Sequence, residues 1–210
     1  MNTRRLIEWW GLAFAAALGI TIVSILWLDA PIARYFFRDS LHVAGLAHAF
    51  GTSVIVSGDT ALMLILALIR IVRGSLPDYA RALFVACAAS LIAFAANDYI
   101  LKLIFGRYGP YTFLGNPTAP LFNFFQGDLN CVFPSGHMVL SAAFAAVLVR
   151  EYPRTWPIFA GLLCLGAILL LIGDWHFLSD VIAGLFTGGT AGIMAGELWY
   201  RHTRHIAAAE

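Results

Sequence analysis

The chain has 210 residues, of which 60% are hydrophobic and only 12% are charged. Soluble domains usually carry about 25% charged residues, so this composition excludes an ordinary soluble protein. The formal net charge of +1 gives no reason to expect a nucleic acid as a partner.

The first apolar segment runs from Trp9 to Leu28 and contains 20 residues without a charge. At about 1.5 Å per residue, a helix of that length crosses the hydrocarbon core of a bilayer, which is about 30 Å thick. The segment is longer than the usual apolar core of a signal peptide, so we expect it to stay in the protein. The following residues, Asp29–Gly51, mix apolar with charged side chains and predict a helix lying at the membrane interface.

Further apolar segments bring the predicted number of membrane-spanning helices to six. They cover Val54–Ile69, Ala82–Ala96, Met138–Val149, Trp156–Gly173 and Val181–Gly196. If consecutive helices alternate in direction, nine of the 13 basic residues fall on one side and four on the other. The more basic side is normally cytoplasmic, so we expect both termini in the cytoplasm. The predicted fold class is all-α, a polytopic membrane protein with six helices and an outward interfacial helix, built as one domain over residues 1–210.

The outward connection from Gly106 to Pro134 is the longest in the prediction, and long loops of this kind are usually functional. The three cysteines, Cys87, Cys131 and Cys164, show no metal-ligand spacing. The sequence therefore indicates neither a metal site nor a cofactor.

A polar cluster, Pro134-Ser135-Gly136-His137, stands where the fourth apolar helix begins. The first amide groups of a helix have no intrahelical partner and favour an anion, and Gly136 lets a phosphate oxygen approach the backbone. His137 can give or take a proton near neutral pH. The alternative is an ordinary helix cap followed by a histidine at the membrane interface.

A second polar cluster, His176 and Asp180, stands between the last two apolar helices. Residues four apart share one helix face, so the carboxylate can orient the imidazole and leave its other nitrogen free to attack. A purely structural His–Asp pair is the alternative. Alternation of the helices places both clusters on the same side as Lys102, and we expect Asp98, four residues earlier, to hold that lysine in an ion pair.

These residues resemble the motifs of the type 2 phosphatidic acid phosphatase (PAP2) superfamily, which includes integral-membrane lipid phosphatases. The family pattern is Lys, six residues, Arg-Pro; then Pro-Ser-Gly-His; then Ser-Arg, five residues, His, three residues, Asp. The matching segments here are Lys102–Pro110, Pro134–His137 and Leu169–Asp180, within a motif region of residues 98–184. Because the six-helix arrangement is also similar, the resemblance extends over most of the chain.

The resemblance implies a role for each matching residue. His176 would be the nucleophile that forms a phosphohistidine, and Asp180 would orient it. His137 would protonate the leaving oxygen and later help to activate water. The phosphate oxygens would be held, without a metal, by Lys102, Ser135 and the backbone of Gly136.

Both arginines of the family pattern are absent. Gly109 and Leu170 stand at their positions, and Arg107 is expected to replace one of them as a phosphate-binding residue. Asp174 adds a negative charge near His176, where it could contact an amine on the substrate headgroup. With fewer arginine clamps, the site suits a doubly charged phosphomonoester less well.

Three interpretations of the function follow. The first is hydrolysis of a lipid phosphomonoester or pyrophosphate at the outer leaflet. The second is transfer of a phosphate-containing headgroup between lipids, as in the similar sphingomyelin synthases, and the third is a non-catalytic relative that binds lipid. The expected partner is a lipid phosphate, and the expected location is a bacterial inner membrane, with the site facing the periplasm or exterior.

Overall fold

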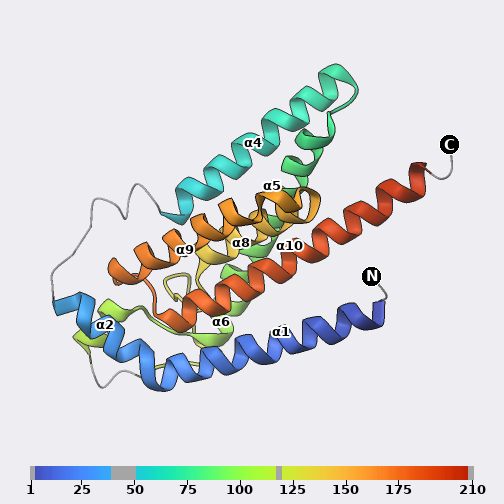
Figure 1. Ribbon diagram of the computed structural model, residues 1–210. Helices are drawn as coiled ribbons and strands as arrows, with labels where there is room; N and C mark the ends of the chain where they lie inside the picture. Colours follow the sequence, from blue (N-terminus) through green and yellow to red (C-terminus); the bar gives the residue numbers. More distant parts are fainter. Residues whose placement is uncertain (1–2, 39–50, 117–119, 208–210) are drawn as a thin grey trace.

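The structure is a computed structural model, and it describes residues 3–38, 51–116 and 120–207. This described part of the chain is helical and contains no strand. The first helix, α1 (Thr3–Val23), continues through the π-helical turn η1 (Ser24–Leu28) into α2 (Asp29–Arg38). The chain changes direction between α1 and α2 (Figure 1), and a π-helical turn is a known cause of such a kink.

The remaining helices pass back and forth through one bundle. They are α4 (Thr52–Arg73), α5 (Asp78–Ala96), η2 (Asn97–Leu101), α6 (Lys102–Phe105), α7 (Pro110–Gly115), α8 (Gly136–Glu151), η3 (Pro153–Thr155), α9 (Trp156–Ile172) and α10 (Leu178–Ala207). The start of α1, the end of α10 and the turn between α4 and α5 lie at one end of this bundle, and α2 and α6 lie at the other (Figure 1).

Five helical segments of the described chain are long and apolar enough to cross a membrane. They are Glu8–Phe37, Thr52–Arg73, Asp78–Gly115, Pro153–Ile172 and Leu178–Arg201. The helix α8 is not among them, because it has only 16 residues. The predicted number of six spanning helices is therefore not confirmed.

The predicted interfacial helix over residues 29–51 is not confirmed either. Its first part, α2, belongs to the same candidate span as α1, and residues 39–50 lie outside the described part of the chain. In the sequence Asp29 looks like a membrane-boundary residue, but its side chain is only 3% exposed in the structure. The protein itself, and not the membrane surface, surrounds this carboxylate.

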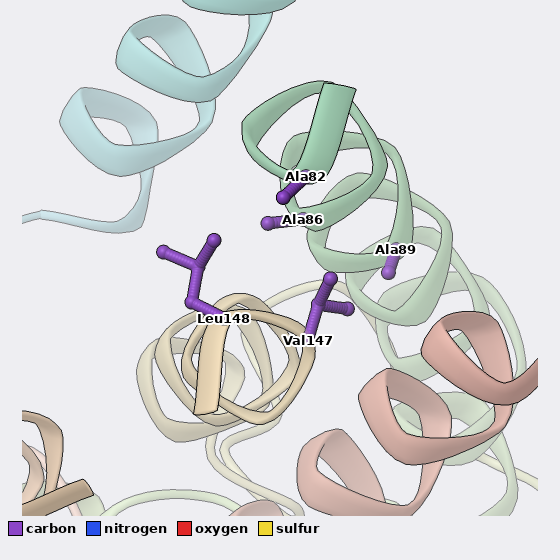
Figure 2. Close-up of a cluster of buried hydrophobic side chains, with 5 residues drawn as sticks. All are labelled: Ala82, Ala86, Ala89, Val147 and Leu148. Carbon is purple, nitrogen blue, oxygen red and sulfur yellow. The ribbon is translucent and has the colours of Figure 1, made fainter. Parts of the chain in front are cut away.

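The core of the bundle is built around α8, which packs against α5 on one side. Figure 2 shows the contact, formed by Ala82, Ala86, Ala89, Val147 and Leu148. Alanine side chains let two helix backbones come close, and dispersion contacts over such a seam are a main source of stability inside a membrane.

Glycines of α10 form the seam on the other side of α8. A Cβ atom on Gly188 would overlap the carbonyl oxygen of Val139, and one on Gly192 would overlap that of Ala143. The two helices therefore touch backbone to backbone. Enclosed between α5 and α10, α8 has little freedom to shift, and this fixes the position of its first residues.

Candidate active site

The turn after α6 directs Arg107 into the bundle. Gly106 ends α6 with φ of 58°, a left-handed conformation that favours glycine. Its carbonyl accepts a hydrogen bond of 3.0 Å from the amide of Asn123, and a Cβ atom on Gly106 would overlap the Asn123 carbonyl oxygen. The next residue, Arg107, is fully buried.

The ion pair expected for Lys102 is confirmed. Its ammonium lies 2.7 Å from Oδ1 of Asp98, one helical turn earlier, and both side chains are mostly buried. Asn97, also buried, donates a hydrogen bond of 3.1 Å to the carbonyl of Pro134. The Asn97 bond attaches the η2 turn, which follows α5, to the residues just before α8.

Ser135 precedes α8 but does not cap it. The side chain makes no capping hydrogen bond, and its buried hydroxyl oxygen has no hydrogen-bond partner among the described residues. Its amide donates to the carbonyl of Asp180 at 3.0 Å. An ordinary helix cap was the alternative for this motif, and the geometry does not favour it.

Gly136 has a packing reason as well as the expected chemical one. A Cβ atom there would lie 2.9 Å from the ring of Phe94 and 3.6 Å from Oδ1 of Asp98. The first residue of α8 therefore lies close to the carboxylate that holds Lys102. Because Asp98 contacts Lys102 and lies close to Gly136, the lysine and the first amides of α8 belong to one site.

The two histidines of the motifs face each other. The ring centroids of His137 and His176 are 5.6 Å apart with the rings at 80°, and His137 also stacks on Trp175 at 6.1 Å. His176 is 7% exposed. Two imidazoles at this separation can act on the same substrate group from two directions.

Asp180 lies on the side of His176 that carries Nδ1. Its Oδ2 is 3.6 Å from that nitrogen, within ion-pair range but beyond a hydrogen bond, and also accepts from the amide of Phe177 at 2.8 Å. Catalytic hydrogen bonds are often long before substrate binds. The Nε2 atom of His176 is left on the opposite edge of the ring.

Arg107 contacts carboxylates in this structure. Its Nη1 donates to Oδ1 of Asp180 at 2.7 Å and to Oγ of Ser179 at 2.6 Å, and its Nη2 donates to Oδ2 of Asp29 at 2.7 Å. The guanidinium also lies 4.1 Å from the ring centroid of Phe177. Phosphate binding by Arg107 stays a prediction, and this geometry favours a role in holding Asp180.

Asp29 and Ser179 were not identified from the sequence. Asp29 accepts from the amide of Ser179 at 3.0 Å and also from its hydroxyl. The only local signal was a carboxylate at the end of the first apolar segment, and its partner Arg107 is 78 residues away. A contact of that separation has no periodicity that a single sequence could show.

The structure accounts for the two absent arginines. Leu170 is 4% exposed and packs with Met138 and Val181 in an apolar cluster. A Cβ atom on Gly109 would lie 3.3 Å from Cγ1 of Val132 and 3.4 Å from the carbonyl oxygen of Trp175. Both positions therefore serve packing in this protein: Leu170 fills an apolar cluster, and a side chain at Gly109 would press on its neighbours.

Two other acids lie in the segments around the site. Asp174 is buried, with φ of 53°, directly before Trp175, and its contact with a headgroup stays a prediction. Asp128, in the loop before α8, accepts from the amide of Asn130 at 2.8 Å and from the hydroxyl of Tyr108 at 3.2 Å. These hydrogen bonds hold the pKa of Asp128 below its usual value, and the bond from the Asn130 amide has the largest effect. An ionised carboxylate thus orders this loop at neutral pH.

Comparison with known proteins identifies the family. The model of the PAP2 superfamily matches residues 78–204, from the start of α5 to near the end of α10. No match was found among curated proteins or among solved structures. The matched region contains both histidines, Lys102, Ser135 and Asp180, and it covers more than half of the 210 residues. The chain belongs to the PAP2 superfamily, whose members are generally phosphatases.

Proposed function

We propose that the protein is a membrane enzyme that hydrolyses a phosphomonoester or pyrophosphate of a lipid through a phosphohistidine intermediate. The observation that carries the proposal is the convergence of His137, His176 and Asp180 on the buried start of α8. A purely structural cluster has no need for two adjacent imidazoles beside a buried Ser135 hydroxyl that has no hydrogen-bond partner among the described residues.

In the first step, Nε2 of His176 attacks the phosphorus while the bond from phosphorus to the leaving oxygen breaks. His137 donates the proton that this oxygen needs, and Asp180 stabilises the positive charge that forms on the imidazole of His176. Water, deprotonated by His137, then attacks the phosphorus and releases free His176 and inorganic phosphate.

The non-bridging oxygens are held by Lys102, the hydroxyl of Ser135 and the first amides of α8. The amides at a helix start carry a partial positive charge, which is effective in a site shielded from water. No step of this mechanism calls for a metal or a cofactor.

An apolar cavity supports a lipid as the substrate. It has a volume of about 180 Å³, and it lies between α8 and α9. The lining residues are Met138, Ser141, Ala145, Phe159, Leu162, Leu163 and Gly166. Met138 directly follows His137 in α8. A hydrocarbon chain in the cavity would therefore contact the residue next to the proposed proton donor.

A second candidate is transfer of a phosphodiester headgroup from one lipid to another. Among the described residues, both cations of the site are already paired, Lys102 with Asp98 and Arg107 with Asp29 and Asp180. A phosphodiester carries a single negative charge and depends less on additional cations than a dianionic monoester does.

Phosphate release from a lipid panel tests the first candidate. Purified protein in detergent would be given phosphatidate, phosphatidylglycerol phosphate and a prenyl pyrophosphate. We expect release from at least one lipid, complete loss with His176→Ala, and no loss with His202→Ala near the end of α10. Trapping with ³²P-labelled lipid should label His176.

Each other result has a separate meaning. No release, together with transfer of a labelled diester headgroup to an acceptor lipid, would favour the second candidate. Neither release nor transfer would favour a non-catalytic, lipid-binding relative.

We also propose that the site faces the periplasm or exterior of a bacterial inner membrane, with both termini in the cytoplasm, because the charge asymmetry of the chain supports that orientation.

A further inference from the structure

Four side chains form a buried ion cluster behind the proposed nucleophile: Asp29, Arg107, Ser179 and Asp180. Their exposed fractions are 3% for Asp29 and 0% for the other three. The cluster holds one cation and two carboxylates. It joins the start of α2 to the turn after α6 and to the first turn of α10, three segments far apart in the sequence.

Burying these charges is costly unless each is fully paired. Both oxygens of Asp29 are used within the cluster, one by the amide of Ser179 and the other by Arg107 and the hydroxyl of Ser179. Asp29 lies outside the residues that the family model matches, 78–204. Its contribution to the site therefore comes from the N-terminal helices, outside the matched region.

The cluster is directed at His176 through Asp180. Oδ1 of Asp180 meets the guanidinium at 2.7 Å, and Oδ2 faces Nδ1 of His176 at 3.6 Å. An arginine paired with Asp180 alone would neutralise that carboxylate. With Asp29 present, the guanidinium is shared between two carboxylates, and the cluster keeps a net charge of −1.

We propose that Asp29 is a positioning residue of the reaction, which keeps the charge of Asp180 available to His176 by taking a share of Arg107. The inference rests on the proposed phosphohistidine chemistry. When Nε2 bonds to phosphorus and the leaving oxygen departs with a proton from His137, the imidazole of His176 becomes positive. The residual negative charge of the cluster stabilises that cation.

The test compares Asp29→Asn with Asp59→Asn. Both remove a carboxylate that contacts another helix, but Asp59 hydrogen-bonds Ser90 between α4 and α5, away from the site. We expect Asp29→Asn to lower kcat about tenfold to a hundredfold, typical for a partner behind a functional group, with KM unchanged within about twofold. We expect Asp59→Asn to keep the wild-type kcat. Thermal unfolding in detergent checks that both variants are folded.

A double variant separates charge from structure. Asp29→Asn alone brings the net charge of the cluster to zero, and Asp29→Asn with Arg107→Gln returns it to −1. If charge is the cause, the double variant has a higher kcat than Asp29→Asn. If the cluster is only a structural support, the second loss lowers kcat further, and this result overturns the inference.

Vanadate binding, followed by ⁵¹V NMR, provides a readout that needs no turnover. Vanadate mimics the five-coordinate phosphorus by accepting a bond from an imidazole nitrogen, so Asp29→Asn should weaken its binding about tenfold. Wild-type protein that binds vanadate but hydrolyses no lipid would contradict the proposed function alone. Equal vanadate affinity and equal kcat in wild type and Asp29→Asn would overturn the inference alone, and no binding by wild type would contradict both.

Discussion

At the scale of single residues, the site is defined by how its few cations are paired. Lys102 and Arg107 each contact a carboxylate at 2.7 Å, and Arg107 contacts two. Such pairs fix the positions of the side chains but reduce the positive charge that a substrate meets. In the proposed mechanism, phosphate binding therefore depends on the amides and the hydroxyl at the start of α8 more than the family pattern implies.

Restoring a family arginine is expected to harm the protein. Leu170→Arg places a guanidinium in the apolar cluster with Met138 and Val181, which costs about 3 kcal/mol for an unpaired charge at membrane depth. We expect lower thermal stability in detergent and no gain in activity. The control is Leu169→Arg, since Leu169 is 37% exposed and stands near the end of α9, from which an arginine can extend to the headgroup region. Increased phosphate release by Leu170→Arg would contradict this reading.

At the scale of helices, the apolar segments of the sequence predicted where helices lie but not how each one is used. The segment Met138–Val149 is indeed helical, yet the helix is enclosed by protein and is too short for a candidate span. The helix α2 was predicted to lie on the membrane surface. The sequence did not show that Asp29 is buried, because its burial depends on Arg107, which is 78 residues away. Hydropathy reports the average surroundings of a segment and carries no information on its partners.

The motifs were the more predictable part of the site. Each motif is local in sequence, so residues such as Ser135, His176 and Asp180 were found together with their spacing. The Lys102–Asp98 pair was found in the same way, since it spans one helical turn. Asp29 and the true partners of Arg107 were missed, because only the folded bundle brings them together.

The seam between α8 and α10 gives a matched test at this scale. Gly188→Val would push against the backbone of Val139, whereas Gly189→Val, one residue on, meets nothing within 4 Å. We expect Gly188→Val to cost about 1–3 kcal/mol of stability, as overpacking does, and to lower activity by displacing the start of α8. Gly189→Val should behave as wild type in thermal unfolding and in phosphate release. Equal melting temperatures for the two variants would show that the seam is looser than described.

At the scale of the whole molecule, the start of α1 and the end of α10 lie at the same end of the bundle (Figure 1). A chain that ends where it began has passed through the bundle an even number of times. The five candidate spans are an odd number of passages, and the short helix α8 lies in the chain between two of them, Asp78–Gly115 and Pro153–Ile172.

Reporter fusions test this arrangement. A green fluorescent protein, which fluoresces only in the cytoplasm, should be bright at either terminus and in the turn at Gly74. A periplasmic alkaline phosphatase reporter should be active after Asn130, in the loop before α8. The physical reason is the excess of basic residues on the side of the bundle that holds the two chain ends, nine against four on the other side. Activity of the two reporters in the opposite pattern would invert the orientation.

The shortness of α8 also sets a depth. Its last turn carries Arg150 and Glu151, whose charges belong at the membrane face. From there 16 residues rise about 24 Å, which is roughly 6 Å less than the thickness of the hydrocarbon core. If the last turn of α8 lies at the membrane face, Ser135 and His137 are expected below the level of the opposite headgroups, and a lipid phosphate would have to move inward to reach them. The rate of the proposed reaction is then expected to depend on bilayer thickness, because a thinner membrane would bring the lipid phosphate closer to the level of the histidines.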